Sequence, residues 1–187
     1  MEHIFRAYDI RGVYGVDIDE NVAFKIGRAI ATYIGDGREV LVGRDVRLSG
    51  RALKDSMVKG LIQGGCNVED AGILTTPILY FSAVHYKKDA GVMVTASHNP
   101  PDWNGFKIWT DEGFICKGKG MEKLRDIVIH EKFGAGRVKG RVKENPNIIP
   151  EYKRYVLERI NIKSNLNIAL DPGNGSCSLL IPDLFEE

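Results

Sequence analysis

Ser97, His98 and Lys107 are the residues of this chain whose types and spacing most directly suggest chemistry. They lie in the segment MVTASHNPPDWNGFKIW, where an apolar run leads straight into Ser97. A histidine or lysine beside a serine can deprotonate its hydroxyl for nucleophilic attack, or can balance the charge of a phosphate attached to it. The alternative is a structural turn, because Ser, Asn and Pro all favour turns and the GxSxG pattern of a nucleophile elbow is absent.

Two further segments combine paired arginines with glycine, namely FRAYDIRG near the N-terminus and GRDVRLSG after an apolar run. The first contains Arg6 and Arg11, and the second contains Arg44 and Arg47. Guanidinium groups are permanently charged, forked donors that suit phosphate. The second segment also precedes a predicted helix, whose N-terminal amides favour anions. Each segment has a simpler explanation, which is an edge strand with ordinary ion pairs for the first and a capped loop for the second.

The elements that must position these residues alternate between apolar strands and amphipathic helices. This alternation predicts an α/β sandwich with a mainly parallel, mixed sheet flanked by helices, followed by the first βα unit of a second similar domain. Ser97 and GRDVRLSG would then share the carboxyl edge of the sheet, where α/β proteins bind ligands. The predicted strands are 39–43, 67–70, 91–95, 106–110 and 166–170, and the predicted helices are 22–34, 50–63, 77–86, 121–132 and 150–160, with another beginning at Ser176.

Local signals predict how these elements begin and turn. Ser49 and Thr76 are predicted to cap the second and third helices, and Pro77 suits a first helical position. Asn104 and Gly105 are predicted to form a tight turn. That turn would return the next strand antiparallel beside 91–95 and so bring Lys107 near Ser97.

The character of the chain changes between about residues 133 and 150, where glycines alternate with basic residues. Such a stretch is typical of a domain edge, so we expect one domain at 1–150 and a second at 151–187. DPGNGS, at 171–176, resembles a phosphate loop but lacks both the Walker and GxGxxG patterns, and the simpler explanation is a glycine-rich turn from strand to helix. A lone strand and helix cannot bury their apolar faces, so we expect the second domain to be incomplete in this chain.

Composition argues against several classes of function. The 26 basic and 25 acidic residues give a net charge of +1, so no basic field indicates nucleic acid or an anionic membrane. No apolar run approaches the roughly 18 residues of a membrane span, and the first residues do not resemble a signal peptide. Cys66, Cys116 and Cys177 form no CxxC pair. We expect a cytoplasmic protein with reduced thiols, and the sequence does not indicate its oligomeric state.

Taken together and in this order, FRAYDIRG, GRDVRLSG, TASHNPPDWNGFKI and DPGNGS resemble the α-D-phosphohexomutase superfamily, most closely its phosphomannomutase/phosphoglucomutase branch. The resemblance covers essentially the whole chain and implies an isomerase. It implies that a phosphoserine at Ser97 passes its phosphoryl group to a mannose or glucose 1- or 6-phosphate. The hexose 1,6-bisphosphate so formed would turn around and return its other phosphate, so that phosphate moves between O1 and O6.

The resemblance also implies roles for single residues. Mg²⁺ would sit on the phosphate of Ser97, and His98, Lys107 and Arg11 would act as acid/base or charge-stabilising groups. The residues alone do not show which of the three transfers protons. The binding residues that we expect are Tyr8, at the family's sugar site, Arg44, for phosphate, and Asn99, which shapes the loop.

Complete members of the superfamily have four domains, and three of their loops are missing here. These are an aspartate-rich loop that binds Mg²⁺ together with the phosphoserine, a sugar-recognition loop and a phosphate-binding loop. We therefore expect this chain alone to be weakly active or inactive. Two alternatives remain, a phosphoglucosamine mutase with the same chemistry on an amino sugar, and a non-catalytic module that binds sugar phosphates or a partner.

Overall fold

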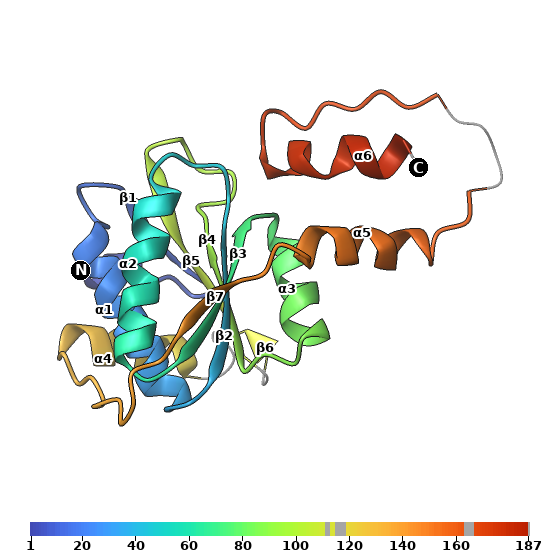
Figure 1. Ribbon diagram of the computed structural model, residues 1–187. Coiled ribbons are helices and arrows are strands. Elements are labelled where there is room, and N and C mark those ends of the chain that lie inside the picture. Colours follow the sequence, from blue (N-terminus) through green and yellow to red (C-terminus); the bar gives the residue numbers. More distant parts are fainter. Residues whose placement is uncertain (111–112, 115–118, 163–166, 187) are drawn as a thin grey trace.

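A mixed β-sheet forms the centre of the computed structural model, which describes residues 1–110, 113–114, 119–162 and 167–186 (Figure 1). Within these residues seven strands join one sheet in the order β1-β5-β4-β2-β3-β7, with β6 paired to β5. The strands are β1 (Ile10–Val13), β2 (Glu39–Arg44), β3 (Asn67–Ile73), β4 (Ala90–Val94), β5 (Trp103–Thr110), β6 (Gly113–Phe114) and β7 (Val142–Glu144).

The directions of the strands confirm the predicted mainly parallel sheet. β2 is parallel to β3 and to β4, and β7 is parallel to β3. β5 runs antiparallel to β4 on one side and to β1 on the other. All five residues of β4 are buried, because helices cover both faces of the sheet and leave no solvent side for polar residues.

The helices form two layers, one on each face of the sheet. The larger core joins the sheet to α1, α2 and α4, and a smaller core joins it to α3 and the start of α5. The two layers lie on opposite sides of the strands in Figure 1. The helices are α1 (Glu20–Ile34), α2 (Gly50–Gln63), α3 (Thr76–His85), α4 (Gly120–Ile129) and α5 (Ile148–Leu157), with a short 3-10 helix η1 (Glu2–Ile4) at the N-terminus.

The helix starts differ in detail from the predicted caps. Asp19 caps α1 by accepting a hydrogen bond from the Val22 amide at 2.8 Å. Ser49 precedes α2 as predicted, but its hydroxyl does not cap the helix. Instead, the hydroxyl oxygen accepts a hydrogen bond from the side-chain amide nitrogen of Asn104 at 2.8 Å. The prediction for Thr76 was wrong. Thr75 is the extended residue before α3, and Thr76 is already helical.

The predicted turn at Asn104 and Gly105 is also wrong, because both residues lie in β5. The two are fully or nearly fully buried, and Gly105 pairs with Arg11 of β1. A Cβ on Gly105 would overlap the backbone oxygen of Ile10. The glycine therefore permits close approach of two strands, and the chain reverses earlier, between Ser97 and Asp102.

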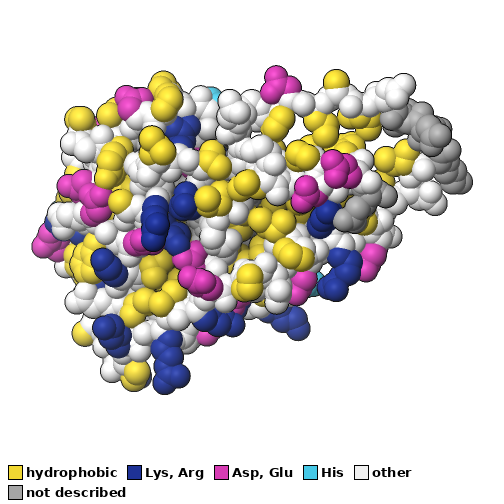
Figure 2. Space-filling model, turned by 45° about the horizontal axis from the view of Figure 1, so that its top comes forward, with side chains coloured by type: hydrophobic (Ala, Val, Ile, Leu, Met, Phe, Trp, Pro, Cys, Tyr) yellow, Lys and Arg dark blue, Asp and Glu magenta, His cyan; other side chains and the backbone are white. Residues whose placement is uncertain are grey.

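The C-terminal segment lies beside α5 (Figure 1). It contains a 3-10 helix η2 (Ser176–Leu179) and α6 (Ile181–Glu186), so the helix expected from Ser176 is present. The strand expected at 166–170 is not formed at 167–170, and residue 166 lies outside the described residues. A strand needs a neighbour to pair with, and this segment pairs with none in the described part of the chain. Figure 2 shows apolar side chains on the surface of this region. Ile168, Leu170 and Phe185 of this segment are each at least 41% exposed.

The expected domain boundary at residue 150 falls inside α5. The first residue of this helix, Ile148, is 1% exposed and packs in the smaller core with residues of α3 and β4. Across the described ranges, no helix has the length and apolarity required to span a membrane.

Cys66 and Cys177, the two cysteines that the structure describes, are both free thiols. Cys66 is buried, and burial raises the pKa of its thiol to about 12, which keeps it protonated. Cys177 is exposed and unpaired. Cys116 lies outside the described residues.

Candidate active site

Ser97 lies just beyond the carboxyl end of β4, on an exposed loop. Its φ of 58° is in the left-handed region, which a non-glycine residue rarely adopts. Its backbone amide donates to the Thr95 Oγ1 atom at 2.8 Å. Among the described residues its hydroxyl has no hydrogen-bond partner, so the side chain is free to react while the backbone is held.

Arg47 makes four hydrogen bonds to the segment that contains Ser97. Its guanidinium group donates to the backbone oxygens of four loop residues, at 3.1 Å for Ser97, 2.6 Å for Asn99, 2.5 Å for Pro100 and 2.9 Å for Trp103. The side chain is only 11% exposed. GRDVRLSG and the serine loop therefore meet at one sheet edge, as predicted from the parallel arrangement of β2 and β4.

Asp45 links Arg47 to Thr95. One of its carboxylate oxygens accepts from the Thr95 hydroxyl at 2.6 Å and lies 3.3 Å from the Arg47 Nε atom. The other accepts from the Arg47 amide at 3.0 Å. The charge of Arg47 is thus balanced locally.

Arg11 holds the loop from the other side. It projects from β1, and its Nη1 atom donates to the Asn99 side-chain oxygen at 2.9 Å. Its Nε and Nη2 atoms both lie 2.7 Å from the Asp9 carboxylate, which is almost fully buried. The structure therefore brings Arg11 and Asn99 together with Ser97.

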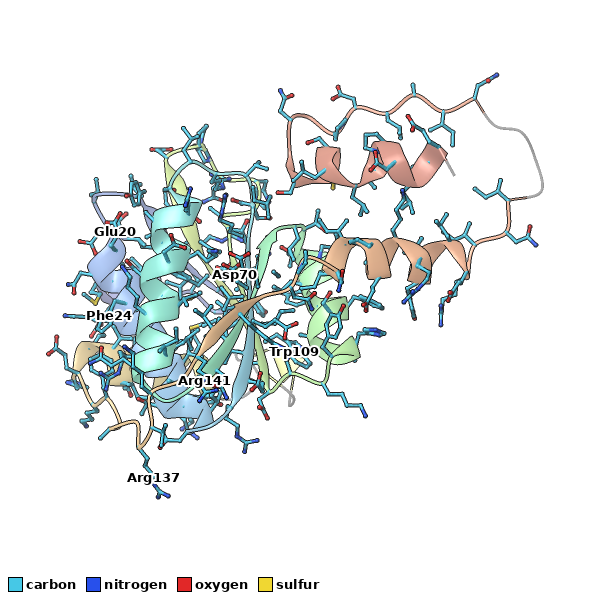
Figure 3. All side chains as sticks on the ribbon, viewed as in Figure 1. Glu20, Phe24, Asp70, Trp109, Arg137 and Arg141 are labelled. Carbon is cyan, nitrogen blue, oxygen red and sulfur yellow. The ribbon has the colours of Figure 1, made fainter. Side chains whose placement is uncertain are left out.

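His98 and Lys107 have no hydrogen bond or ion pair within the described residues. His98 is exposed next to Ser97, and Lys107 is partly buried in β5. Lys107 pairs with Met93 across the strands, so β5 returns beside β4 as expected. Trp109, labelled in Figure 3, follows Lys107 by two residues and packs at the edge of the smaller core, so both lie on that face of the sheet.

Arg44 and Tyr8 border hollows other than the one beside Ser97. Arg44 donates to the Asp45 backbone oxygen at 3.0 Å and lines a hollow of about 540 Å³ with Lys54 and Asp70, which pair with each other. Asp70, labelled in Figure 3, lies in the middle of β3. Tyr8 is 76% exposed and lines a hollow of about 410 Å³ beside α4, with Arg125.

A hollow of about 550 Å³ separates the serine loop from the DPGNGS turn. Arg47, Ser97 and Asn99 line one side of it, and residues 172–177 line the other. The Asn174 backbone is left-handed, with φ 57°, which suits the tight turn there. The four sequence motifs thus lie around or next to one exposed serine.

Residues 2–146 match the family model described as phosphoglucomutase/phosphomannomutase, alpha/beta/alpha domain I. This chain belongs to that family. It is 39% identical over 188 residues to a Pseudomonas putida phosphomannomutase/phosphoglucomutase, covering 99% of this chain and 40% of the relative. It is 33% identical over 184 residues to a Methanococcus maripaludis phosphoglucosamine mutase, covering 97% of this chain and 40% of that protein.

A solved structure of a phosphoglucomutase/phosphomannomutase family protein from Burkholderia thailandensis has the same fold. It superimposes with a TM-score of 0.87 at 33% identity, covering 100% of this chain and 42% of that one. The chain therefore spans about two fifths of the length of the curated relatives that it matches.

The carboxylates near Ser97 do not suit a metal ion in this member of the family. Asp45 is the only carboxylate lining the hollow beside Ser97 in the described residues, and both of its oxygens already accept hydrogen bonds. Elsewhere in the described ranges, no group of three His, Cys, Asp or Glu side chains is arranged to hold a metal ion. Because Mg²⁺ prefers carboxylate and phosphate oxygens, these residues do not form a magnesium site by themselves.

The sequence analysis named Arg47 as one of two arginines in GRDVRLSG. The predicted site nevertheless contained neither Arg47 nor Asp45 nor Thr95. Strand periodicity assigns a side of the sheet to Arg44 only, because Arg47 lies beyond the end of β2. Alternate residues of a strand face opposite sides of the sheet, so Arg44 shares a side with Val40 and Val42, which face the larger core. No short-range signal shows that Arg47 reaches a loop 50 residues later in the chain.

Proposed function

We propose that Ser97 carries a phosphoryl group that the protein moves between O1 and O6 of a hexose phosphate. The substrates would be mannose or glucose 1- or 6-phosphate, with a hexose 1,6-bisphosphate as intermediate and activator. The observation that carries the proposal is the free Ser97 hydroxyl, presented beside a hollow by a backbone that is held at both its amide and its carbonyl. The printed names of the relatives support the choice of substrates.

Each transfer would exchange one phosphorus–oxygen bond for another. The bond from phosphorus to the Ser97 oxygen breaks as a bond forms to a sugar hydroxyl oxygen. The sugar hydroxyl gives up its proton to a base, and the Ser97 oxygen is left as a hydroxyl after it receives a proton. The return step is the reverse with the other sugar oxygen, so no net hydrolysis occurs. Phosphoryl transfer of this kind depends mainly on positioning and on neutralising charge.

His98 and Lys107 are the proton-transfer candidates in this proposal, and both are free of partners in the described residues. A free imidazole can donate a proton to a reacting oxygen or accept one from it, and a free lysine can donate as an ammonium group or accept as a neutral amine, without first breaking another bond. Arg11 would act differently, because Asp9 and Asn99 already occupy its guanidinium group. We therefore assign Arg11 a charge-stabilising role next to the loop. Tyr8, Arg44 and Asn99 complete the proposed binding residues.

Mg²⁺ belongs to the proposal as the cation that balances the phosphate on Ser97. When bound, it would supply charge neutralisation. The phosphate would provide one of its ligands, while the carboxylates that it prefers are not found near Ser97 in the described residues. We also propose a cytoplasmic location, as expected in the sequence analysis for a protein with reduced thiols.

The test is whether the chain becomes phosphorylated on Ser97. The chain is incubated with glucose 1,6-bisphosphate or mannose 1,6-bisphosphate and Mg²⁺, and intact-mass and peptide analysis locate any added phosphoryl group. We expect one group, added slowly to Ser97 because this chain alone is expected to be weakly active, and none on Ser97→Ala. A chain that stays unmodified, or a group that attaches elsewhere, contradicts the proposal and favours a non-catalytic module.

The phosphoglucosamine mutase relative supports a second candidate with the same chemistry. Charging with glucosamine 1,6-bisphosphate in parallel distinguishes the two. Faster charging by the amino-sugar bisphosphate than by either hexose bisphosphate would favour the second candidate.

A further inference from the structure

We infer that Arg47 is a positioning residue that holds Ser97 in its reactive conformation and does not itself bind phosphate. This inference deepens the proposed function and rests on it where catalysis is concerned. It starts from the backbone of Ser97, which is left-handed at φ 58°. That conformation is unfavourable for a residue with a Cβ atom, so other contacts must maintain it on an exposed loop.

The contacts that maintain it meet at one carboxylate. The Ser97 amide donates to the Thr95 hydroxyl, which donates in turn to Asp45. The Ser97 carbonyl accepts from Arg47, which pairs with the same Asp45 oxygen. Both backbone polar atoms of the nucleophilic residue are therefore fixed through Asp45.

Arg47 has no donor left for a phosphate. A guanidinium group carries five N–H donors, and the four on Nη1 and Nη2 go to the backbone oxygens of Ser97, Asn99, Pro100 and Trp103. The fifth, on Nε, makes no hydrogen bond, but it is buried 3.3 Å from an Asp45 carboxylate oxygen, so a phosphate in the hollow cannot reach it. An arginine that met phosphate directly would instead keep a forked pair of donors exposed.

The geometry also explains why arginine is needed at this position. The planar guanidinium group of Arg47 reaches four carbonyl oxygens that are spread over seven residues. A lysine ammonium group has only three donors, all on one nitrogen, and could not reach all four. Arg47→Lys should therefore retain part of the restraint, and Arg47→Ala should lose it. Loss of positioning by about 1 Å can lower a rate by about 100-fold.

The test compares Arg47→Ala and Arg47→Lys with Arg51→Ala, a nearby control whose side chain is 82% exposed. The chain is charged with glucose 1,6-bisphosphate in single-turnover experiments, which give a maximum rate and a half-saturating concentration. We expect Arg47→Ala to lower the maximum rate about 100-fold, with a half-saturating concentration within about twofold of the wild-type value. The maximum rate of Arg47→Lys should lie between those of Arg47→Ala and wild type. Arg51→Ala should match wild type. An unchanged maximum rate, or a loss confined to half-saturation, would overturn the inference.

Hydrogen exchange provides a readout that does not depend on catalysis. The amides of Ser97, Asn99 and Trp103 are bonded within the loop, and they should exchange at least about tenfold faster in Arg47→Ala than in wild type while β4 stays protected. If wild type never becomes phosphorylated, the proposed function fails. The positioning role is then judged by exchange alone: faster exchange of the loop amides in Arg47→Ala than in wild type supports it, and unchanged exchange refutes it. Where Arg47→Ala does not fold, Arg47→Lys is judged by the same two measurements.

Discussion

Thr95 shows at the residue scale how one hydroxyl can serve two partners. It is 4% exposed, donates to Asp45 and accepts from the Ser97 amide. A buried polar group left without its partner loses more free energy than a formed hydrogen bond contributes. The hydroxyl of Thr95 thus supports both the carboxylate that balances Arg47 and the backbone of Ser97.

We predict that Thr95→Val lowers the free energy of unfolding by about 1–3 kcal/mol, because a carboxylate and an amide each lose a partner while the shape is kept. Urea unfolding followed by tryptophan fluorescence measures the change. Thr75→Val is the matched control, since the Thr75 hydroxyl does not cap α3. Equal losses in the two variants would show that the hydroxyl does not carry the effect.

The limits of prediction are visible in two arginines. Arg11, Asn99 and Ser97 were all expected in the site, and the structure hydrogen-bonds Arg11 to the Asn99 side chain and to the backbone oxygen of Ala96, the residue before Ser97. The predicted site contains Arg44 and not Arg47. Both arginines lie in one glycine-bounded segment, and composition does not distinguish them. The direction of each side chain depends on the strand end and on a loop from another part of the chain, and neither is encoded locally.

At the element scale, periodicity predicted the long helices and the buried strands well, because each depends on its own residues. The errors occurred where a neighbour decides the conformation. Asn104 and Gly105 have turn propensity, but pairing with β1 extends them. Residues 167–170 have strand propensity, but they lie outside any sheet in the described structure.

β7 is attached to β3 by backbone pairing and by charge, and not by apolar packing. Its three residues are exposed, but Lys143 and the adjoining Asn145 both reach the Glu69 carboxylate of β3 at 2.8 and 2.6 Å. Burial of Glu69 would raise its pKa, but hydrogen bonds from Lys143, Asn145 and Lys88 outweigh burial and lower the pKa from 4.5 to about 2. A lowered pKa means that this carboxylate stabilises the fold when it is charged.

We predict that Glu69→Gln is less stable than wild type near neutral pH and that the difference shrinks as pH falls. The contribution of Glu69 is fully present above about pH 4.5 and is lost toward about pH 2, because protonation then costs the native state its ion pairs. Urea unfolding across this range measures the difference. Glu144→Gln, in the same strand and exposed, is the control. A difference that stays constant with pH would contradict the assignment.

At the scale of the whole molecule, the first folded unit continues past the family match at residue 146. Ile148 is buried, the Tyr86 hydroxyl donates to Glu151 at 2.6 Å, and Phe81 lies 5.2 Å from the Tyr152 ring. These contacts fix α5 on α3. We therefore propose that the boundary between the two units follows α5.

A chain that ends at residue 162 should lose about 1.5–3 kcal/mol relative to the whole chain, because it lacks Leu180, which is 4% exposed in the smaller core. A chain that ends at residue 146 should lose at least about 2 kcal/mol more, because burial of Ile148 alone is worth about 1.5–3 kcal/mol. Thermal and urea unfolding compare the three chains. Equal stability of the chains ending at 146 and 162 would place the boundary before α5.

The central claim is that Ser97 passes phosphate to a sugar, and discharge of the phosphorylated chain tests it most directly. The charged chain is freed of bisphosphate and mixed with mannose 6-phosphate or glucose 6-phosphate, and mass spectrometry follows both protein and sugar. The account predicts that the phosphoryl group leaves Ser97 and that an equal amount of hexose 1,6-bisphosphate appears. Release of inorganic phosphate alone, or a phosphoserine that the sugar phosphate never discharges, would contradict it.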